Sequence, residues 1–112
     1  MIKAVNLHKF YDELHVLKGV NLEIEKSEVI SIVGASGTGK TTLLQILGTL
    51  DSFSSINEKS SLSIDGQDID TLNQQQLAKF RNKNLGFVFQ FHQLLPEFSA
   101  LENICIPAYI GN

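Results

Sequence analysis

Eight consecutive residues in the first half of the chain have the types and spacing of a phosphate-binding loop. They are Gly34-Ala35-Ser36-Gly37-Thr38-Gly39-Lys40-Thr41, and they match the pattern G-x-x-x-x-G-K-S/T. The three glycines allow the backbone to curl with its N–H groups pointing inward, and the Lys40 ammonium can reach outer phosphates. The hydroxyl of Thr41 is the kind of hard oxygen ligand that Mg²⁺ prefers. We therefore expect this loop, together with Thr42, to bind phosphate.

The residues on either side of the loop predict the elements that must position it. Residues 29–33 are almost continuously apolar, which is typical of a parallel strand buried on both faces. Apolar residues after Gly39 recur at helical spacing as far as Gly48, and the helix that they predict would add partial positive charge at its start. The alternative interpretation is a Gly-rich turn that happens to precede a helix. A strand before the loop and a helix after it favour the phosphate site.

Other segments alternate between apolar and polar residues, as strands with one solvent-exposed face do. These segments are residues 2–7, 20–25 and 62–64, and the last of them ends at the turn pair Asp65-Gly66. Residues 85–89 resemble the buried type of strand instead, and we expect Phe87 and Phe89 in the core. The two strand types together predict an α/β core that carries an antiparallel appendage.

Two further helices are predicted, each opened by a capping box. Thr71 with Gln74 opens the first, and Ser99 with Glu102 opens the second, which Pro107 should kink or end. The apolar residues expected on the inner faces of these helices are Leu72, Leu77, Phe80, Leu101, Ile104, Cys105 and Ala108.

Length and composition limit the possible classes of protein. A chain of 112 residues with 43% hydrophobic and 19% charged residues forms one globular domain at most. The net charge of -3 supplies no basic field, so a nucleic-acid partner is not expected. Cys105 is the only cysteine, and no apolar stretch approaches the ~20 residues of a membrane span. We therefore expect a cytoplasmic chain without a signal peptide or a disulfide.

A second motif resembles a known family. Residues 86–96 read Gly-Phe-Val-Phe-Gln-Phe-His-Gln-Leu-Leu-Pro, and residues 99–103 read Ser-Ala-Leu-Glu-Asn. Together they closely resemble the Q-loop region of ABC transporter ATPases, and most of all those of lipoprotein-releasing systems and their macrolide-exporter-like relatives. Residues 7–11 and 16–20 are similar to the adenine-stacking segment of the same family. The resemblance implies an α/β fold with a P-loop NTPase (RecA-like) core and an antiparallel β-subdomain.

The resemblance also implies roles for single residues. Tyr11 would stack on adenine, while Lys40 and the loop amides would hold the phosphates of ATP. Thr41 and Gln90 would bind Mg²⁺, and Gln90 would also reach the attacking water. Alternatively, Tyr11 is a partly buried aromatic residue, with Phe10 facing the core, and Gln90 is an ordinary polar residue at a strand end.

By the same resemblance, residues 1–112 are the N-terminal half of a nucleotide-binding domain, truncated before the helical signature region. The signature motif, the catalytic Glu and the switch His are expected beyond Asn112, so the chain alone should not hydrolyse ATP. The implied partners are membrane-spanning transporter subunits at the inner face of the membrane and a second copy of the ATPase. The alternative is an ABC-type ATPase of DNA repair or translation, and Gln90 with its neighbours disfavours a metabolite kinase.

Four smaller predictions concern the remaining segments. Residues 51–61 are Ser-rich and should form a surface loop longer than is usual in the family. His8, His15 and His92 are expected as scattered surface residues, and Cys105 as a buried inert thiol. Residues 90–104 include several apolar side chains in a stretch that is mostly not helical, and we expect them to dock a membrane subunit.

Overall fold

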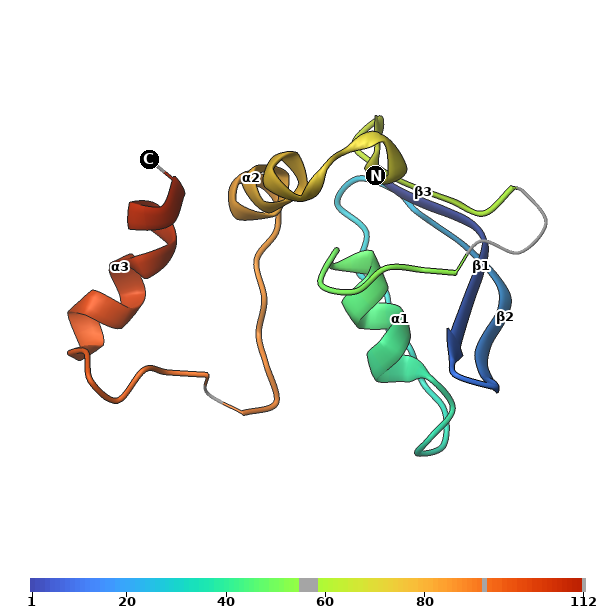
Figure 1. Ribbon diagram of the computed structural model, residues 1–112, viewed down its shortest axis with the longest axis horizontal. Helices are drawn as coiled ribbons and strands as arrows, with labels where there is room; N and C mark the ends of the chain where they lie inside the picture. Colours follow the sequence, from blue (N-terminus) through green and yellow to red (C-terminus); the bar gives the residue numbers. More distant parts are fainter. Residues whose placement is uncertain (55–58, 92, 112) are drawn as a thin grey trace. The chain divides into compact units, whose positions relative to one another are not determined.

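The computed structural model describes residues 1–54, 59–91 and 93–111 of the chain. The chain consists of two compact units, Met1–Asn73 and Gln74–Asn112. Figure 1 shows a sheet and a helix in the first unit and two helices in the second. The phosphate-loop residues and Tyr11 belong to the first unit, and Gln90 belongs to the second.

The first unit contains a four-stranded sheet in the order β2-β1-β3-β4. Its strands are β1 (Ile2–Tyr11), β2 (Leu14–Ile24), β3 (Ser61–Ile64) and β4 (Gln67–Asp68), and all neighbours are antiparallel. The turn between β3 and β4 has positive φ angles at Asp65 (49°) and Gly66 (79°), as a tight two-residue hairpin turn requires. The predicted antiparallel strands and this turn are therefore confirmed.

A bulge interrupts the pairing of β1 with β2. Ala4 pairs with Leu22 and Leu7 pairs with Val20, so that two residues of β1 lie opposite Asn21 alone. The extra residue, Asn6, has a φ of 52°, and its N–H donates to the Asn21 side chain at 2.9 Å. A bulge bends the strand and increases its twist.

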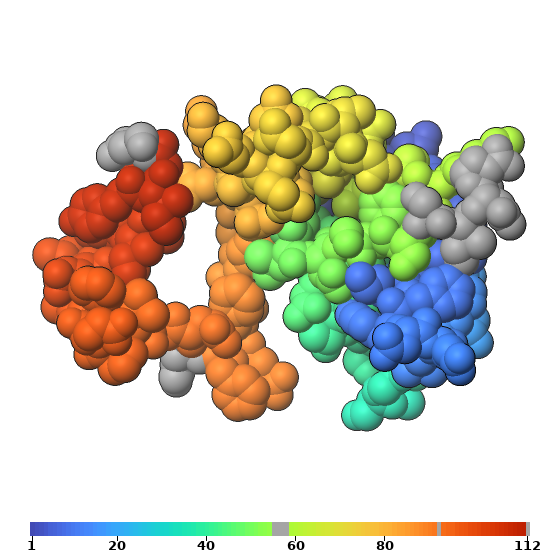
Figure 2. Space-filling view, in the orientation of Figure 1, coloured from blue at the N-terminus to red at the C-terminus, as the bar shows by residue number. Residues whose placement is uncertain are grey.

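Helix α1 (Lys40–Leu47) supplies one side of the core of the first unit. Its buried residues Leu43, Ile46 and Leu47 recur at helical spacing, and they confirm the helix predicted after the phosphate loop. The other buried apolar residues come from the sheet and a short 3₁₀ turn, η1 (Ile69–Thr71). They are Ala4, Leu7, Leu17, Leu62, Ile64 and Ile69. Figure 2 shows α1 and the sheet in contact, with the segment before α1 protruding.

The two parallel strands predicted at residues 29–33 and 85–89 are not formed. Val29 and Val33 are 94% and 86% exposed, and Phe87 and Phe89 are 38% and 49% exposed. A parallel strand obtains its ladder of hydrogen bonds from neighbouring strands. Within the described part of the chain neither segment has such a neighbour, so the prediction of Phe87 and Phe89 as core residues is wrong. Their rings stack on each other instead, with centroids 5.6 Å apart.

The second unit contains α2 (Gln74–Asn84) and α3 (Ala100–Gly111). The capping box predicted at Thr71 is wrong, because the Thr71 hydroxyl donates to the Asp68 carbonyl at 2.8 Å and closes η1. Helix α2 therefore begins only at Gln74, after that turn. A side chain that bonds its own preceding turn is not available to cap the next helix.

The capping box predicted for α3 is confirmed. The N–H of Ser99 donates to Glu102 at 2.9 Å, and the N–H of Glu102 donates to the Ser99 hydroxyl at 3.2 Å. Hydrogen bonds to the Glu102 carboxylate, first from the Ser99 backbone and then from the Ser99 side chain, hold the pKa of Glu102 below its ordinary value. Pro107 lies inside the helix, which continues to Gly111, so Pro107 does not end it.

No described residue of α2 or α3 is fully buried. Leu77, Phe80 and Cys105 are half-buried, whereas Leu101 and Ile104 are 70% and 76% exposed. The predictions of a buried Cys105 and of a buried apolar face on α3 are therefore wrong. Helices with few apolar neighbours leave much of their hydrophobic surface in water.

Candidate functional site

The phosphate loop folds around the ammonium of its own lysine. Lys40 is the first residue of α1, and its Nζ donates to the carbonyl oxygens of Gly34 and Ala35, both at 2.7 Å. The Thr38 hydroxyl donates to the same Ala35 carbonyl at 2.6 Å. Residues at both ends of the loop are thus joined across it. The positive charge lies within the curl that the sequence pattern predicts.

Glycine is favoured at Gly39 and at Gly37 of the loop for different structural reasons. A Cβ at Gly39 would lie 3.0 Å from Val16 and 3.2 Å from Leu17, so Gly39 allows α1 to start close against β2. Gly39 and Gly37 both have positive φ, at 94° and 79°, which disfavours other residues. Beside Gly37 a Cβ would meet nothing within 4 Å, so open space adjoins the backbone there. That space leaves room for a ligand against the main chain.

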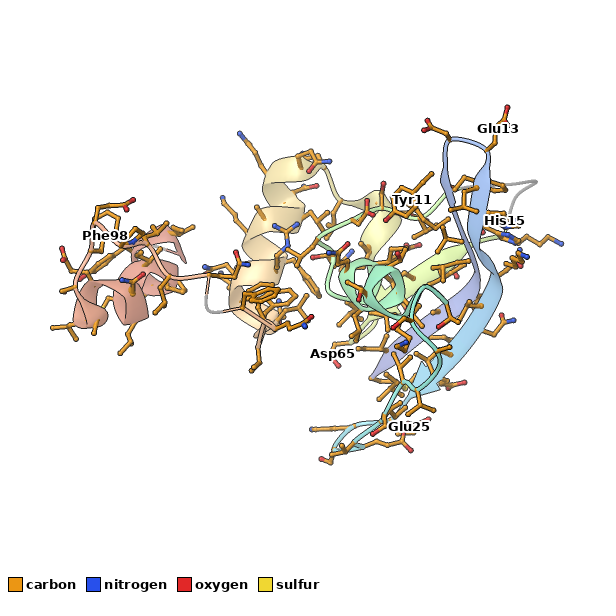
Figure 3. The ribbon with its side chains drawn as sticks, turned by 90° about the horizontal axis from the view of Figure 1, so that it is seen from below. Tyr11, Glu13, His15, Glu25, Asp65 and Phe98 are labelled. Carbon is orange, nitrogen blue, oxygen red and sulfur yellow. The ribbon has the colours of Figure 1, made fainter. Side chains whose placement is uncertain are left out.

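A pocket of about 350 Å³ joins the loop to the end of β1. Its size is within the range of sites that hold small ligands. The lining residues are Tyr11, Val16, Ser36, Gly37, Gly39, Lys40, Thr41 and Thr42. Tyr11 lies on the α1 side of the β1–β2 hairpin (Figure 3). The structure therefore brings Tyr11 together with most of the predicted phosphate-binding residues, although they are far apart in the sequence.

Two residues at this site were not assigned a role by sequence reasoning. Val16 lines the pocket from β2, and it is the first residue of a segment that the family resemblance already includes. Asp51 accepts a hydrogen bond from the Tyr11 hydroxyl at 3.2 Å and forms an ion pair with Lys9 at 3.0 Å. Burial alone would raise the pKa of Asp51, but hydrogen bonds from Lys9, Ser52 and Tyr11 hold it below its ordinary value. No local sequence signal marks this pairing, because its members lie about 40 positions apart.

His8 and His15 are not scattered, contrary to the prediction. His8 Nδ1 lies 3.0 Å from His15 Nε2 across the β1–β2 pair, and both residues are half-buried. His15 also stacks on Phe10, with ring centroids 4.0 Å apart. The bulged register of the hairpin creates this contact. Just before the predicted surface loop leaves the described part of the chain, the N–H of Ser54 donates to the His8 carbonyl at 2.7 Å. Residues 55–58 of that loop and His92 lie outside the described residues.

Gln90 lies in a segment of the second unit that has no regular secondary structure, and it is exposed. The apolar side chains that follow it are exposed as well: Phe91 is 72%, Leu94 64% and Phe98 43% exposed. The role of Gln90 in binding Mg²⁺ and reaching the attacking water stays a prediction. None of the helices in the described part of the chain is long and apolar enough to cross a membrane.

The sequence matches the family described as "ABC transporter" over residues 17–110. The chain belongs to the ABC transporter family. The matched region contains the phosphate loop and Gln90, and Tyr11 precedes it. The resemblance stated from the sequence is therefore confirmed, and the family is one of nucleotide-binding ATPases.

Curated relatives in this family carry a more specific name. The chain is 56% identical to the lipoprotein-releasing system ATP-binding protein LolD of Bacteroides thetaiotaomicron, covering 99% of this chain and 49% of that protein. It is 57% identical to LolD of Porphyromonas gingivalis over the same shares. The chain thus spans about half the length of the curated relatives that it matches.

Solved ABC cassettes have the same fold. A dimeric ATP-binding cassette in a post-hydrolysis state with ADP and Pi aligns with a TM-score of 0.90 at 37% identity. The alignment covers 100% of this chain and 48% of that one. A dimeric bacterial ABC transporter cassette matches with the same TM-score at 38% identity. These matches confirm the predicted fold class, although residues 29–33 and 85–89 form no strands in this structure.

Proposed function

We propose that the chain is the nucleotide-binding part of an ABC transporter ATPase that powers lipoprotein release. The observation that carries the proposal is the pocket in which Tyr11 and the phosphate loop meet. An aromatic face binds a purine face, and a curled backbone with a lysine binds phosphates. The LolD relatives of Bacteroides thetaiotaomicron and Porphyromonas gingivalis support the choice of lipoprotein release over other ABC functions.

The residues of the pocket fit a nucleotide with Mg²⁺. The open space beside Gly37 leaves the loop backbone accessible, and Lys40 supplies a cation at the same place. Thr41 lines the pocket with a hydroxyl oxygen. The role of Gln90 as a second oxygen ligand of Mg²⁺ rests on the family resemblance alone. Bound Mg²⁺ would supply the charge that offsets the phosphate oxygens. In this proposal Lys40 and the loop amides hold the phosphates while Tyr11 holds the base.

Residues 1–112 correspond, in this proposal, to the N-terminal half of the ATPase domain. Neither Glu97 nor Glu102 follows an apolar strand ending in Asp, so neither is placed to activate water. Glu102 is committed to the Ser99 capping box. The chain alone would then bind ATP, and hydrolysis would need the general base, signature motif and switch His of the remainder. Gln90 would orient the attacking water in the complete domain.

Residues 90–104 are proposed as the docking surface for membrane-spanning subunits at the inner face of the membrane. The exposed apolar side chains Phe91, Leu94, Leu95 and Phe98 support this role. A second copy of the ATPase would complete the transporter assembly, as the dimeric cassettes suggest. Cross-linking of cysteines at Leu95 and Glu97 to the membrane subunits is the test. A lack of adducts, with adducts at Lys79→Cys on α2, would contradict the docking role.

Calorimetry with MgATP tests the nucleotide site. We expect Lys40→Ala to weaken binding strongly, because a charge-assisted contact to phosphate contributes ~1.5 to 3 kcal/mol. Lys79→Ala removes an exposed lysine from α2 and serves as the matched control. Equal affinity of the Lys40→Ala variant and the native chain would refute the assignment.

The choice between transport and a soluble ATPase of DNA repair or translation needs a different experiment. The protein, purified from membranes of its own cells, should carry the membrane subunits of a lipoprotein-releasing system. Release of a labelled lipoprotein from proteoliposomes should then require Lys40. Recovery with ribosomes or DNA instead would favour the alternative.

A further inference from the structure

The carboxylate of Asp51 has different partners on its two oxygens. Oδ1 accepts from Lys9 Nζ at 3.0 Å and from the N–H of Ser52 at 2.8 Å. Oδ2 accepts from the Tyr11 hydroxyl at 3.2 Å. Lys9 Nζ also donates to the Ser52 carbonyl at 2.7 Å. The Tyr11 bond is therefore made to a carboxylate that other groups already hold in place.

Asp51 is sheltered, and it is fixed to α1. The side chains of Lys9 and Asp51 are only 12% and 29% exposed, so water screens their attraction less than at an open surface. The main-chain N–H groups of Leu50 and Asp51 both donate to the Gln45 carbonyl, at 2.8 and 3.2 Å. Gln45 lies within α1, the helix that begins with Lys40. The carboxylate is thus linked through one helix to the phosphate loop.

The Tyr11 ring is restrained at its outer end. Tyr11 lines the pocket, whereas its hydroxyl is bonded to Asp51, which is not a lining residue. Lys9 Nζ lies over the ring, 5.3 Å from its centroid, and covers one face. A side chain that is 45% exposed at the end of a strand would otherwise sample several rotamers. The bond and the lysine leave one ring face for a ligand.

We propose that Asp51 is a positioning residue that orients Tyr11 for the nucleobase. The inference rests on the proposed function, because it concerns the same pocket. Lys40 at the start of α1 would hold phosphate, while Asp51 beyond its end would set where the ring meets the base. Lys9 assists by holding Asp51. A positioned ring loses less rotamer freedom when a ligand binds, which raises affinity for ligands that carry a base.

The test compares MgATP with magnesium tripolyphosphate, which has phosphates without a base. Calorimetry is carried out on the chain and on Asp51→Ala, Tyr11→Phe and the double variant. We expect Asp51→Ala and Tyr11→Phe each to weaken ATP binding about fivefold, the size of one lost hydrogen bond. The double variant should be no weaker than the worse single variant, because both remove the same bond. Tripolyphosphate affinity should not change.

The controls separate this inference from the proposed function. Asp70→Ala removes another carboxylate of the first unit and should leave both ligands unaffected. Lys40→Ala should weaken both, and if the native chain bound neither ligand the proposed function itself would fail. Equal losses of ATP and tripolyphosphate in Asp51→Ala, no loss at all, or additive losses in the double variant would each overturn the positioning role. Tyr11→Phe leaves the Lys9–Asp51 pair intact, so the test remains decisive if Asp51→Ala unfolds.

Discussion

Asn103 is bonded to both main-chain groups of Leu95. The N–H of Leu95 donates to Asn103 Oδ1 at 2.9 Å, and Asn103 Nδ2 donates to the Leu95 carbonyl at 3.2 Å. The same amide nitrogen also lies 3.2 Å from the Phe98 carbonyl and 2.9 Å from that of Ser99. One side chain from the first turn of α3 thus closes the loop that the proposed docking surface contains.

We expect Asn103→Ala to open this loop. The Leu95 N–H should exchange with solvent about fivefold faster or more, because at least one hydrogen bond of ~1 kcal/mol is lost. Hydrogen exchange followed by NMR measures the effect. Asn84→Ala is the matched control, since the Asn84 amide bonds the Phe80 carbonyl within α2. Unchanged exchange at Leu95 would mean that other contacts shape the loop.

Gly39→Ala should destabilise the first unit more than Gly37→Ala. Both positions have positive φ, which costs a residue with a Cβ about 1 to 2 kcal/mol. Only at Gly39 would the new Cβ also press against Val16 and Leu17. Urea unfolding measures the difference. Gly86→Ala has open space and no positive φ, so it should change the free energy of unfolding least.

Tyr11→Ala should weaken ATP binding about tenfold, because the variant loses the aromatic face as well as the hydroxyl bond. Tyr11→Phe keeps that face and should lose less. Fluorescence titration with an adenine nucleotide analogue checks both. Similar affinity for the Ala and Phe variants would argue against a ring contact with the base.

Asp51 gives the first unit a defined response to acid. Its folded pKa is lowered from the ordinary value of 3.8, so its contribution to stability is present above 3.8 and is lost as the pH falls through the lowered value. The free energy of unfolding should therefore decline on acidification below about pH 4. In Asp51→Ala that decline should be shallower. Identical slopes would show that other carboxyl groups govern acid unfolding.

The 112-residue chain should release no phosphate from ATP above the rate of Lys40→Ala. Transfer to water needs a positioned base and stabilisation of the developing charge, and the described site supplies only binding groups. A coupled phosphate assay with excess MgATP is sufficient. Turnover that depends on Lys40 would show that the chain contains its own base.

Local patterns were sufficient for several elements. The phosphate loop, helix α1, the Ser99–Glu102 box and the Asp65-Gly66 turn each depend on residues within a few positions of one another. Their backbone angles and nearest hydrogen bonds follow from residue type, which can be read directly from a sequence. The antiparallel strands were also predictable, because alternation marks a strand with one wet face.

Tertiary structure decided the relations between distant residues. Residues 29–33 are apolar enough for a buried strand, but a strand also needs partners, and composition does not say whether partners are present. The Tyr11–Asp51 bond and the His8–His15 contact depend on register, a bulge and the end of α1, which bring side chains from separate segments together. The sequence by itself therefore determined the position and residue types of the predicted phosphate loop. Two features were decided only by the packing of the β1–β2 hairpin beside α1: Tyr11 shares a pocket with that loop, and Asp51 restrains the Tyr11 ring. The reason is that contacts between distant segments form only when the sheet and the helix pack.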